Sequence, residues 1–296
     1  MVAPGNSNEP GSGKKDRRDA AREKARLDRE VEKRRSRRNR GLLQGGIVVV
    51  VLAVATIITL VVVNSSVPAS TVGPKNMASN GIVLSGADMT AVTTPTAKLN
   101  GVGVATAKSA TTVPVSIVTY IDYQCPYCMQ FETTNSEQIA TWVKGGQATV
   151  EIHPIAILDN ASLGNRYSTR SANAAVCVAN FDPKNFYAVN AALFANQPAE
   201  RSSGKSDAQI LATLKTAGAD SEAITTCVKD ETFSAWVKAS TSQLKAGSDS
   251  KVFKDVATEP QVFAGTPTVF VNGQKYPGSI TDPAVFAAFV QSIATS

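Results

Sequence analysis

The stretch that decides the fold is Val113–Cys128, which reads VPVSIVTYIDYQCPYC. Its first ten residues, Val113–Asp122, are mostly apolar or β-branched and predict a buried β-strand. The strand runs directly into Cys125-Pro126-Tyr127-Cys128, and Met129–Lys144 predicts a helix that ends at a pair of glycines. A Cys-x-x-Cys motif between a strand and the start of a helix is typical of redox chemistry.

The motif places a reactive thiol at the start of a helix. Pro126 suits the first helical turn, where its missing N–H costs no hydrogen bond. Cys125 then lies just before the helix, where unpaired N–H groups and the positive end of the helix dipole stabilise a thiolate. Cys128 lies one turn further on and can attack Cys125 in a mixed disulfide. We therefore predict Cys125 and Cys128 as the catalytic pair, with Pro126 and Tyr127 completing the active-site motif.

A structural Cys-x-x-Cys and a zinc site are the alternatives. The other two cysteines, Cys177 and Cys227, are single residues 50 positions apart, and His153 is the only histidine of the chain. This spacing differs from the ligand spacing of structural zinc sites, so we expect neither a metal nor a cofactor.

The rest of the body extends this start into an α/β pattern. Ala148–Ile155 predicts a second strand, and Gly265–Gly273 predicts a third that turns at its final Asn-Gly into a short fourth. Thr281-Asp282-Pro283 caps a last helix. Residues 166–249, between the two halves, predict several helices.

This arrangement resembles the thioredoxin-fold family of extracytoplasmic thiol–disulfide oxidoreductases, in its DsbA-like branch from actinobacteria. The resemblance covers residues 113–296 and implies an α/β thioredoxin fold over 113–165 and 250–296, with an α-helical insertion over 166–249. It also implies that the Thr266–Pro267 peptide bond is cis, lies beside the cysteine pair and binds an extended stretch of substrate. The residues that carry the resemblance are Asp122–Cys128, Phe131-Glu132, Arg170–Ala175, Leu193–Pro198 and Gly265–Thr268.

One position departs from the family pattern. Family members often carry a Glu a few residues before the first cysteine, and this Glu relays a proton for the buried thiol. Thr119 and Ile121 stand at the nearby positions here, and neither can ionise. Asp122 is the nearest residue that can, but its position alone assigns it no role in proton transfer.

The N-terminal part carries a predicted transmembrane helix. Leu42–Val63 contains 22 residues without a charge, and as a helix it spans about 33 Å, enough for a bilayer core of about 30 Å. A cleaved signal peptide is the main alternative, but its apolar run is usually shorter. Residues 1–41 form a tail with 14 basic and 7 acidic side chains, whereas only Lys75 follows within twenty residues of the helix. We therefore expect a single-pass cell-membrane protein with residues 1–41 in the cytoplasm and the body outside.

Residues 64–112 are rich in Ser, Thr, Ala, Gly and Pro and predict a flexible extracytoplasmic stalk. Within it, Gly81–Leu84 and Gly101–Ala105 are candidates for short strands at the domain edge. Residues 1–41 carry a net charge of +7, which leaves 16 basic and 17 acidic side chains for the rest of the chain and a formal charge of +6 overall. A body with this balance lacks the electrostatic basis for binding nucleic acid.

Cys177 and Cys227 lie on two predicted helices of the insertion. Outside the membrane an unpaired duo would be exposed to oxidation, so we predict a structural Cys177–Cys227 disulfide. Two reduced, buried cysteines are the alternative. A second redox pair is disfavoured because neither cysteine has a close partner or a predicted exposed helix start.

These features predict a membrane-anchored, extracytoplasmic thiol–disulfide oxidoreductase that oxidises cysteine pairs in secreted proteins. A reductase or isomerase with the same chemistry is the first alternative, and a non-catalytic binding module or chaperone is the second. The expected partners are unfolded secreted proteins with free thiols and, by analogy with the family, a membrane reoxidant that is DsbB-like or similar to vitamin-K epoxide reductase. No separate dimerisation module is visible in the sequence, and we expect a monomer.

Overall fold

The computed structural model describes residues 73–98, 115–246 and 262–294, together with five residues near the N-terminus. The chain divides into two compact units, Met1–Ser66 and Val67–Ser296. The five described residues of the first unit are exposed and helical: Glu23, Lys24, Arg26, Glu30 and Lys33. The predicted transmembrane helix Leu42–Val63 lies outside the described residues, and none of the helices within them is long and apolar enough to cross a bilayer.

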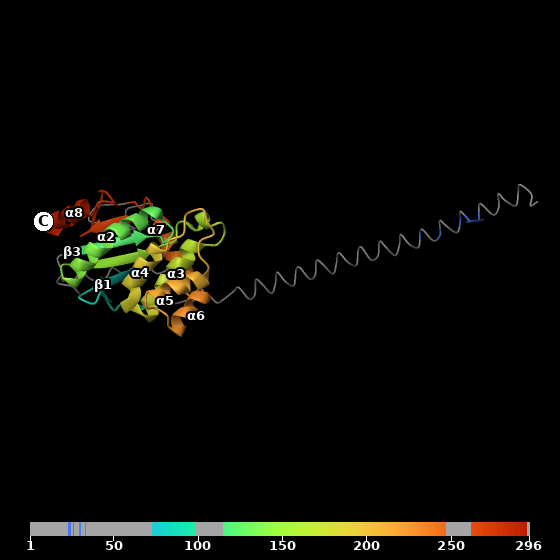
Figure 1. Ribbon diagram of the computed structural model, residues 1–296, viewed down its shortest axis with the longest axis horizontal. Helices are drawn as coiled ribbons and strands as arrows, with labels where there is room; N and C mark the ends of the chain where they lie inside the picture. Colours follow the sequence, from blue (N-terminus) through green and yellow to red (C-terminus); the bar gives the residue numbers. More distant parts are fainter. Residues whose placement is uncertain are drawn as a thin grey trace, which may run out of the picture. The chain divides into compact units, whose positions relative to one another are not determined.

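Six strands form one sheet in the second unit. They are β1 Ile82–Ser85, β2 Thr90–Ala91, β3 Val115–Ile121, β4 Ala148–Pro154, β5 Thr268–Val271 and β6 Gln274–Lys275. Their order across the sheet is β2-β1-β4-β3-β5-β6 (Figure 1). Strands β3 and β4 run parallel, whereas all other neighbours are antiparallel. Ile117 of the central strand β3 pairs with Val150 on one side and with Val271 on the other.

The predicted strands of the body all form. The hairpin between β5 and β6 shows why the Asn272-Gly273 sequence predicted a turn. Asn272 and Gly273 have φ angles of 46° and 84°. A two-residue hairpin turn of type I′ requires positive φ at both positions, which Asn-Gly tolerates well. Asn272 Oδ1 also accepts a 2.7 Å hydrogen bond from the Ser116 backbone N–H, which ties the turn to the start of β3.

Seven helices belong to the described part of this unit. They are α2 Pro126–Lys144, α3 Tyr167–Phe181, α4 Phe186–Ala195, α5 Asp207–Thr216, α6 Glu222–Lys229, α7 Ser234–Ala246 and α8 Pro283–Ala294. Figure 1 shows α3, α4, α5 and α6 grouped together, with α8 at the opposite end of the domain. The region predicted as a helical insertion is therefore helical throughout its described length, apart from its connecting loops.

Helices cover both faces of the sheet. On one face α2 packs with α8, where the rings of Phe131 and Phe286 meet edge to face at 5.3 Å. On the other face Leu244 of α7 packs in an apolar cluster with Val118 of β3 and Phe270 of β5. The last helix of the predicted insertion thus also covers one face of the sheet.

Residues 73–98, which the composition assigned to a flexible stalk, are part of the folded domain. Strand β1, expected at Gly81–Leu84, pairs with β4 and turns back into β2. Met77, Ile82 and Leu84 are fully buried. The stalk prediction was wrong here because it rested on the average composition of the segment. A few apolar residues in this segment suffice to form a strand that pairs with the edge of β4 and buries its side chains. Residues 64–72 and 99–112, including the second candidate strand, lie outside the described residues.

The same N-terminal segment is pinned to the end of α3. The Lys75 backbone N–H donates a 2.9 Å hydrogen bond to Asn180 Oδ1, and Asn76 Nδ2 donates a 3.0 Å bond to the Ala179 carbonyl oxygen. These bonds and the β1–β4 pairing hold residues 73–98 against both the sheet and the insertion.

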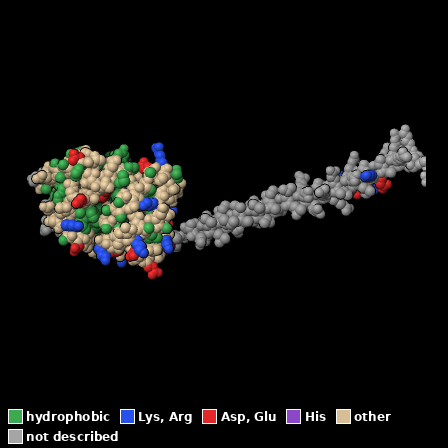
Figure 2. All heavy atoms as spheres, viewed as in Figure 1, with side chains coloured by type: hydrophobic (Ala, Val, Ile, Leu, Met, Phe, Trp, Pro, Cys, Tyr) green, Lys and Arg blue, Asp and Glu red, His purple; other side chains and the backbone are tan. Residues whose placement is uncertain are grey.

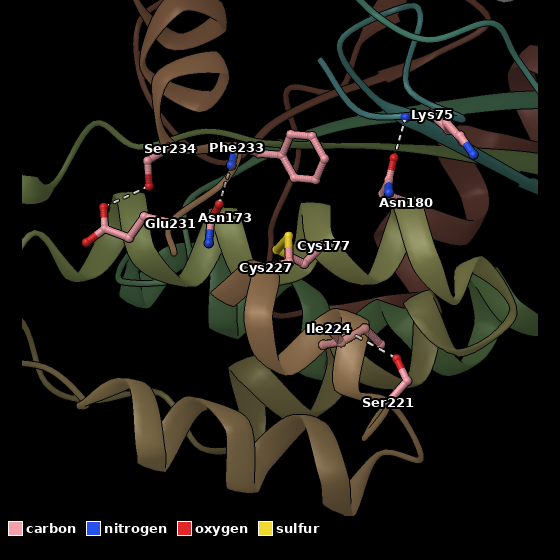
Figure 3. The surroundings of a disulfide bond; sticks show 10 residues. All are labelled: Lys75, Asn173, Cys177, Asn180, Ser221, Ile224, Cys227, Glu231, Phe233 and Ser234. Atoms are coloured by element: carbon pink, nitrogen blue, oxygen red, sulfur yellow. Dashed lines mark hydrogen bonds between the residues drawn. A yellow bond between two sulfur atoms is a disulfide. The ribbon is translucent and has the colours of Figure 1, made fainter. Parts of the chain in front are cut away.

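Helix α3 forms the centre of the insertion, and the predicted Cys177–Cys227 disulfide joins it to α6 (Figure 3). The two Cα atoms lie 5.9 Å apart. Nearby, the Phe233 backbone N–H donates a 2.8 Å hydrogen bond to Asn173 Oδ1 of α3, which fixes the loop that leads into α7. The disulfide and this hydrogen bond hold α6 and α7 on the buried helix α3.

The charged side chains of the described domain carry both signs. Figure 2 shows Lys and Arg interspersed with Asp and Glu over one face. This face therefore presents no extended field of one sign that would attract a polyanion.

Candidate active site

Cys125 immediately precedes α2, and its backbone is extended, with φ −78° and ψ 116°. Pro126 occupies the first helical turn, so the local structure has the form that the sequence predicted. The Cys125 side chain is 4% exposed, and its thiol donates a 3.3 Å hydrogen bond to the Thr266 carbonyl oxygen. Cys128 is fully buried one turn further along α2. Both cysteines are free thiols here, so the structure describes the reduced form.

The two thiols differ in their acidity. The pKa of Cys125 is lowered to about 7, first by a hydrogen bond from Cys128 and then by contacts with Thr266 and with the backbone at the start of α2, which together outweigh its burial. The pKa of Cys128 is raised well above its ordinary value, mainly because burial penalises a charge on its sulfur. Near neutral pH the pair therefore has one sulfur that readily becomes a thiolate and one that holds its proton.

The loop that faces Cys125 contains a cis peptide bond. This is the Thr266–Pro267 bond, as the resemblance to the family implied. Gly265 before it adopts φ 145°, a region that favours glycine, and Thr268 Oγ1 donates a 2.7 Å hydrogen bond to the Gly265 carbonyl oxygen. These contacts fix the loop at the start of β5, so that the carbonyl group of Thr266 faces Cys125.

Two further loops are fastened to the cysteine motif. Gln124 Nε2 donates a 3.1 Å hydrogen bond to the Ala161 carbonyl oxygen in the loop before α3. Gln197, just after α4, donates from Nε2 to the carbonyl oxygens of Tyr123 and Cys125 at 3.0 Å each. Gln197 lies in a segment that carried the resemblance, but nothing in its spacing indicated that it would contact the cysteine loop.

Three large apolar side chains are exposed on the motif and on the segments next to these contacts. Tyr127 between the two cysteines is 61% exposed, Leu163 is 72% exposed, and Val262 is 55% exposed. Leu163 closely follows Ala161, and Val262 shortly precedes the cis-proline loop. Exposed apolar side chains near a reactive group are suited to contact with a polypeptide chain.

Asp122, the ionisable residue considered above for proton transfer, is fully buried and accepts four hydrogen bonds. Its Oδ1 accepts hydrogen bonds from the Gln124 backbone N–H and from Ser168 Oγ, both at 2.8 Å. Its Oδ2 accepts from the backbone N–H groups of Ile157 and Leu158, at 2.8 and 3.0 Å. Burial raises the pKa of Asp122 to about 6 in spite of these four bonds. The carboxyl group thereby ties the cysteine motif to α3 and to the loop after β4.

Glu132 belongs to a segment that carries the family resemblance, but its position in the sequence indicated no role for it. In the structure it is buried on α2, one turn beyond Cys128. Asn190 Nδ2 of α4 donates a 2.9 Å hydrogen bond to Glu132 Oε2. Burial raises the pKa of Glu132 to about 7, partly opposed by this bond. The burial of Glu132 depends on its contact with α4, which no local sequence pattern indicated.

The fold and the cysteine site define a thiol–disulfide oxidoreductase of the DsbA type. The family model described as Thioredoxin matches residues 110–291, more than half of the chain. The chain belongs to the thioredoxin family.

Solved structures show the same relationship. Reduced DsbG from Mycobacterium tuberculosis is 28% identical, with a TM-score of 0.51 over 62% of this chain and 79% of that chain. Oxidised DsbA from the same bacterium is 25% identical, with a TM-score of 0.53 over 73% and 93% of the two chains. Oxidised BdbD from Bacillus subtilis, at 16% identity and a TM-score of 0.52, over 77% and 100% of the two chains, shares the fold. No curated protein matches the chain significantly.

Proposed function

We propose that this protein oxidises cysteine pairs in secreted polypeptides, with the Cys125–Cys128 disulfide as the oxidant. The observation that carries the proposal is the asymmetry of the pair. Cys125 lies at the start of α2 with its pKa lowered to about 7, whereas Cys128 lies in the core with a raised pKa. Such a pair has one sulfur suited to exchange with a substrate and one suited to remain inside the protein.

The reaction proceeds in two displacements. A substrate thiolate attacks Cys125 Sγ, which forms a mixed disulfide, breaks the Cys125–Cys128 bond and leaves the bonding electron pair on Cys128. A second substrate thiolate then attacks the substrate sulfur of the mixed disulfide, forms the substrate's disulfide and releases Cys125 as a thiolate. Two electrons pass from substrate to enzyme. The lowered pKa of Cys125 favours the second step because a less basic thiolate leaves faster.

The surroundings of Cys125 supply a place for the substrate chain. The backbone of Thr266 and Pro267 pairs with an extended substrate segment, in the manner of strand addition. The exposed side chains of Tyr127, Leu163 and Val262 offer apolar contact without demanding a particular substrate sequence. This arrangement favours unfolded polypeptides as substrates.

The proposal includes an anchor and a compartment. Leu42–Val63 is the membrane-spanning segment, residues 1–41 are cytoplasmic, and the catalytic domain lies outside the cell membrane, where disulfides persist. A membrane protein of the DsbB-like or vitamin-K-epoxide-reductase-like kind reoxidises the Cys125–Cys128 pair. Labelling of single cysteines placed at residues 20 and 80 of the full chain in whole cells tests this topology, because only the second should react with an impermeant reagent.

The direction of the reaction depends on the reduction potential. Tyr127 between the cysteines has no cationic group to stabilise the Cys125 thiolate, and we expect a moderate oxidant. A measured potential as low as the approximately −270 mV of thioredoxin would instead favour a reductase.

A trapping experiment tests the proposal as a whole. In Cys128→Ala the Cys125 thiolate attacks a disulfide of a secreted protein, forms a mixed disulfide and releases the second sulfur of that protein as a thiolate. With Cys128 absent, the enzyme has no internal thiol to resolve the mixed disulfide, so secreted proteins should accumulate covalently on it. Cys125→Ser, as the matched control, should trap none. If Cys128→Ala captured no partner through Cys125, the assignment of secreted proteins as exchange partners would fail, and the proposed oxidase would fail with it.

A further inference from the structure

The peptide groups on both sides of Cys125 are held by hydrogen bonds. Its backbone N–H donates a 2.9 Å bond to the Asp122 carbonyl oxygen, which closes a turn. Its carbonyl oxygen accepts from the Met129 backbone N–H at 3.1 Å and from Gln197 Nε2 at 3.0 Å. The first two bonds lie within α2 and the cysteine loop, Asp122–Cys125, and follow from the local fold. The third comes from the segment after α4, 72 residues away.

We propose that Gln197 is a positioning residue for disulfide exchange, because it holds the backbone of Cys125 in the orientation that aims its sulfur at the start of α2. The inference rests on the proposed function, since it concerns the same reactive sulfur. The side chain of Gln197 carries no charge, and its two hydrogen bonds go to backbone oxygens. Its influence on Cys125 must therefore pass through the geometry of the peptide groups.

One amide group bridges two carbonyl oxygens. Gln197 Nε2 also donates a 3.0 Å hydrogen bond to the Tyr123 carbonyl oxygen. A side-chain amide has two N–H bonds, so each oxygen can receive a hydrogen atom of its own. The two oxygens belong to the peptide groups before Gln124 and after Cys125. Gln197 therefore fixes the relative orientation of these peptide groups and, with it, the backbone of Cys125, whose ψ is 116°.

Helix α4 holds Gln197 in place. The Gln197 backbone N–H donates a 3.0 Å hydrogen bond to the Phe194 carbonyl oxygen in the last turn of α4. The Phe194 ring packs on that of Tyr123 at 5.0 Å, and the Tyr123 hydroxyl donates a 2.9 Å bond to Asn190 Oδ1. Tyr123, Asn190 and Phe194 are all buried. Because its base is fixed, the Gln197 amide loses little conformational entropy when it binds the two oxygens.

This geometry matters because directional bonds stabilise the Cys125 thiolate. The pKa of Cys125 is lowered first by a hydrogen bond from the Cys128 thiol, and then by Thr266 and by the backbone N–H groups of Cys128 and Tyr127. Of these groups only the Cys128 thiol titrates, and burial raises its pKa. Hydrogen bonds weaken steeply as their angle departs from linearity. If the peptide group after Cys125 were free to turn, the thiolate would lose part of this stabilisation and its pKa would rise.

A purely structural role is the alternative for Gln197. The hydrogen bond between Tyr123 and Asn190 also ties α4 to the cysteine loop, but through side chains alone. Removing the Tyr123 hydroxyl deletes this bond and leaves both bonds of Gln197 in place. Tyr123→Phe is therefore a control that loosens α4 without releasing the Cys125 carbonyl oxygen.

The test compares Gln197→Met with the wild type, because methionine keeps the length of the side chain and removes its donors. The full-length protein, reduced only at Cys125 and Cys128, reacts with hydroxyethyl disulfide, a small neutral probe, between pH 5 and 10. The Cys125 thiolate attacks the probe, forms a mixed disulfide and releases one mercaptoethanol thiolate. The midpoint of the rate profile should rise by about one pH unit in Gln197→Met.

Such a shift has a signature in the rates. At pH 6 the variant should react about threefold more slowly than the wild type, because a tenfold smaller thiolate fraction is partly offset by the greater nucleophilicity of a more basic sulfur. Above pH 9, where both proteins carry the thiolate, the variant should react about threefold faster for the same reason. A loss of access or of structure would instead lower the rate at every pH.

Two controls separate position from stability. Tyr123→Phe should unfold more readily than the wild type and keep its midpoint. Asn196→Ala should follow the wild type, since Asn196 is exposed and its Nδ2 donates to the Ala192 carbonyl oxygen of α4. An unmoved midpoint in Gln197→Met, or an equal shift in Tyr123→Phe, would overturn the proposal.

Should Gln197→Met fail to fold, Gln197→Ala serves instead, because this side chain is only partly buried. Its midpoint should rise as well, and an unmoved midpoint overturns the proposal. Trapping by Cys128→Ala requires the Cys125 sulfur and is independent of Gln197. A failed midpoint test with successful trapping therefore refutes only the role of Gln197, whereas failed trapping refutes the oxidase.

Discussion

The two cysteine pairs of this protein share burial but differ in almost every other respect. Cys125 and Cys128 are 4% and 0% exposed, and Cys177 and Cys227 are 0% and 3% exposed. The first pair lies three residues apart at the start of α2, whereas the second joins two helices across 50 residues. Burial alone therefore does not decide which pair exchanges electrons.

The difference lies in what the helices offer to the sulfur atoms. At the start of α2 the backbone N–H groups have no partners within the helix, so they can stabilise the Cys125 thiolate. Cys177 lies well inside α3, where each N–H already bonds to a carbonyl four residues earlier. Only the first pair also faces the Thr266 carbonyl group in a fixed loop. Position along a helix thus separates a reactive pair from a stabilising one.

The largest expected effect is on the rate of disulfide exchange, and it tests whether only the Cys125–Cys128 pair is reactive. Replacing Cys125 by Ser should lower the rate of disulfide exchange with a dithiol peptide at least 1,000-fold, because a serine cannot form the disulfide. The double variant Cys177→Ser/Cys227→Ser should retain a rate within about threefold of the wild type, since it leaves the start of α2 unchanged. If the double variant lost activity as completely as Cys125→Ser, the second pair would have a redox role.

The next effect concerns the stability of the folded domain, which should depend on the Cys177–Cys227 disulfide much more than on the Cys125–Cys128 pair. Removing the Cys177–Cys227 disulfide frees a loop of 50 residues in the unfolded chain and should lower the free energy of unfolding by about 2–4 kcal/mol. Denaturant unfolding of the described domain, starting from Val67, measures this loss. Reducing the wild type selectively at Cys125–Cys128 is the control, and it should shift the midpoint much less because that loop contains only two intervening residues. A larger shift in the control would contradict the division of roles.

The reactive pair was predictable from sequence because its determinants are local. The strand, the Cys-x-x-Cys and Pro126 in the first turn lie within sixteen residues, and each follows from backbone chemistry. The cis bond at Thr266 and the second disulfide could not be predicted from local sequence alone. The first came from the resemblance to a family, and the second from an inference about the compartment.

What the sequence could not predict depends on tertiary contacts. Glu132 on an amphipathic helix is exposed or buried according to whether α4 covers it. Gln197 donates a hydrogen bond to the carbonyl oxygen of Cys125, which lies 72 residues earlier in the chain, and no local pattern specifies this contact. The composition of residues 64–112 indicated a stalk, although strand β1 lies within this segment. These four residues form a strand because they pair with the edge of β4, and composition carries no information about that pairing. Each of these features is fixed by the partner segment rather than by the residue itself.

A third effect is a difference of about 1.5 pH units between alkylation midpoints, and it sharpens the comparison of the two cysteine pairs. Alkylation of the reduced, folded protein by iodoacetamide should show Cys125 reacting with a midpoint near pH 7, where its thiolate forms. Cys177 and Cys227, released by reduction in the unfolded protein, should react with midpoints near 8.5, the ordinary value for a thiol. Peptide mass mapping after brief alkylation distinguishes the sites. Coincident midpoints would mean that the helix start does not activate Cys125.

The smallest effect tests whether one or both thiols of the Cys125–Cys128 pair have a lowered pKa. The measurement is the dependence of the reduction potential on pH. Below pH 7 the reduced pair takes up two protons with two electrons, so the potential should fall by about 60 mV for each pH unit. Above pH 7 Cys125 remains a thiolate while Cys128 holds its proton, and the fall should lessen to about 30 mV for each pH unit. An ordinary dithiol keeps the steeper slope until about pH 8.5. Glutathione equilibrium measured from pH 5.5 to 9 would locate the bend. A bend at pH 8.5 would indicate two ordinary thiols, and a slope that vanished by pH 9 would mean that the core does not hold the proton on Cys128.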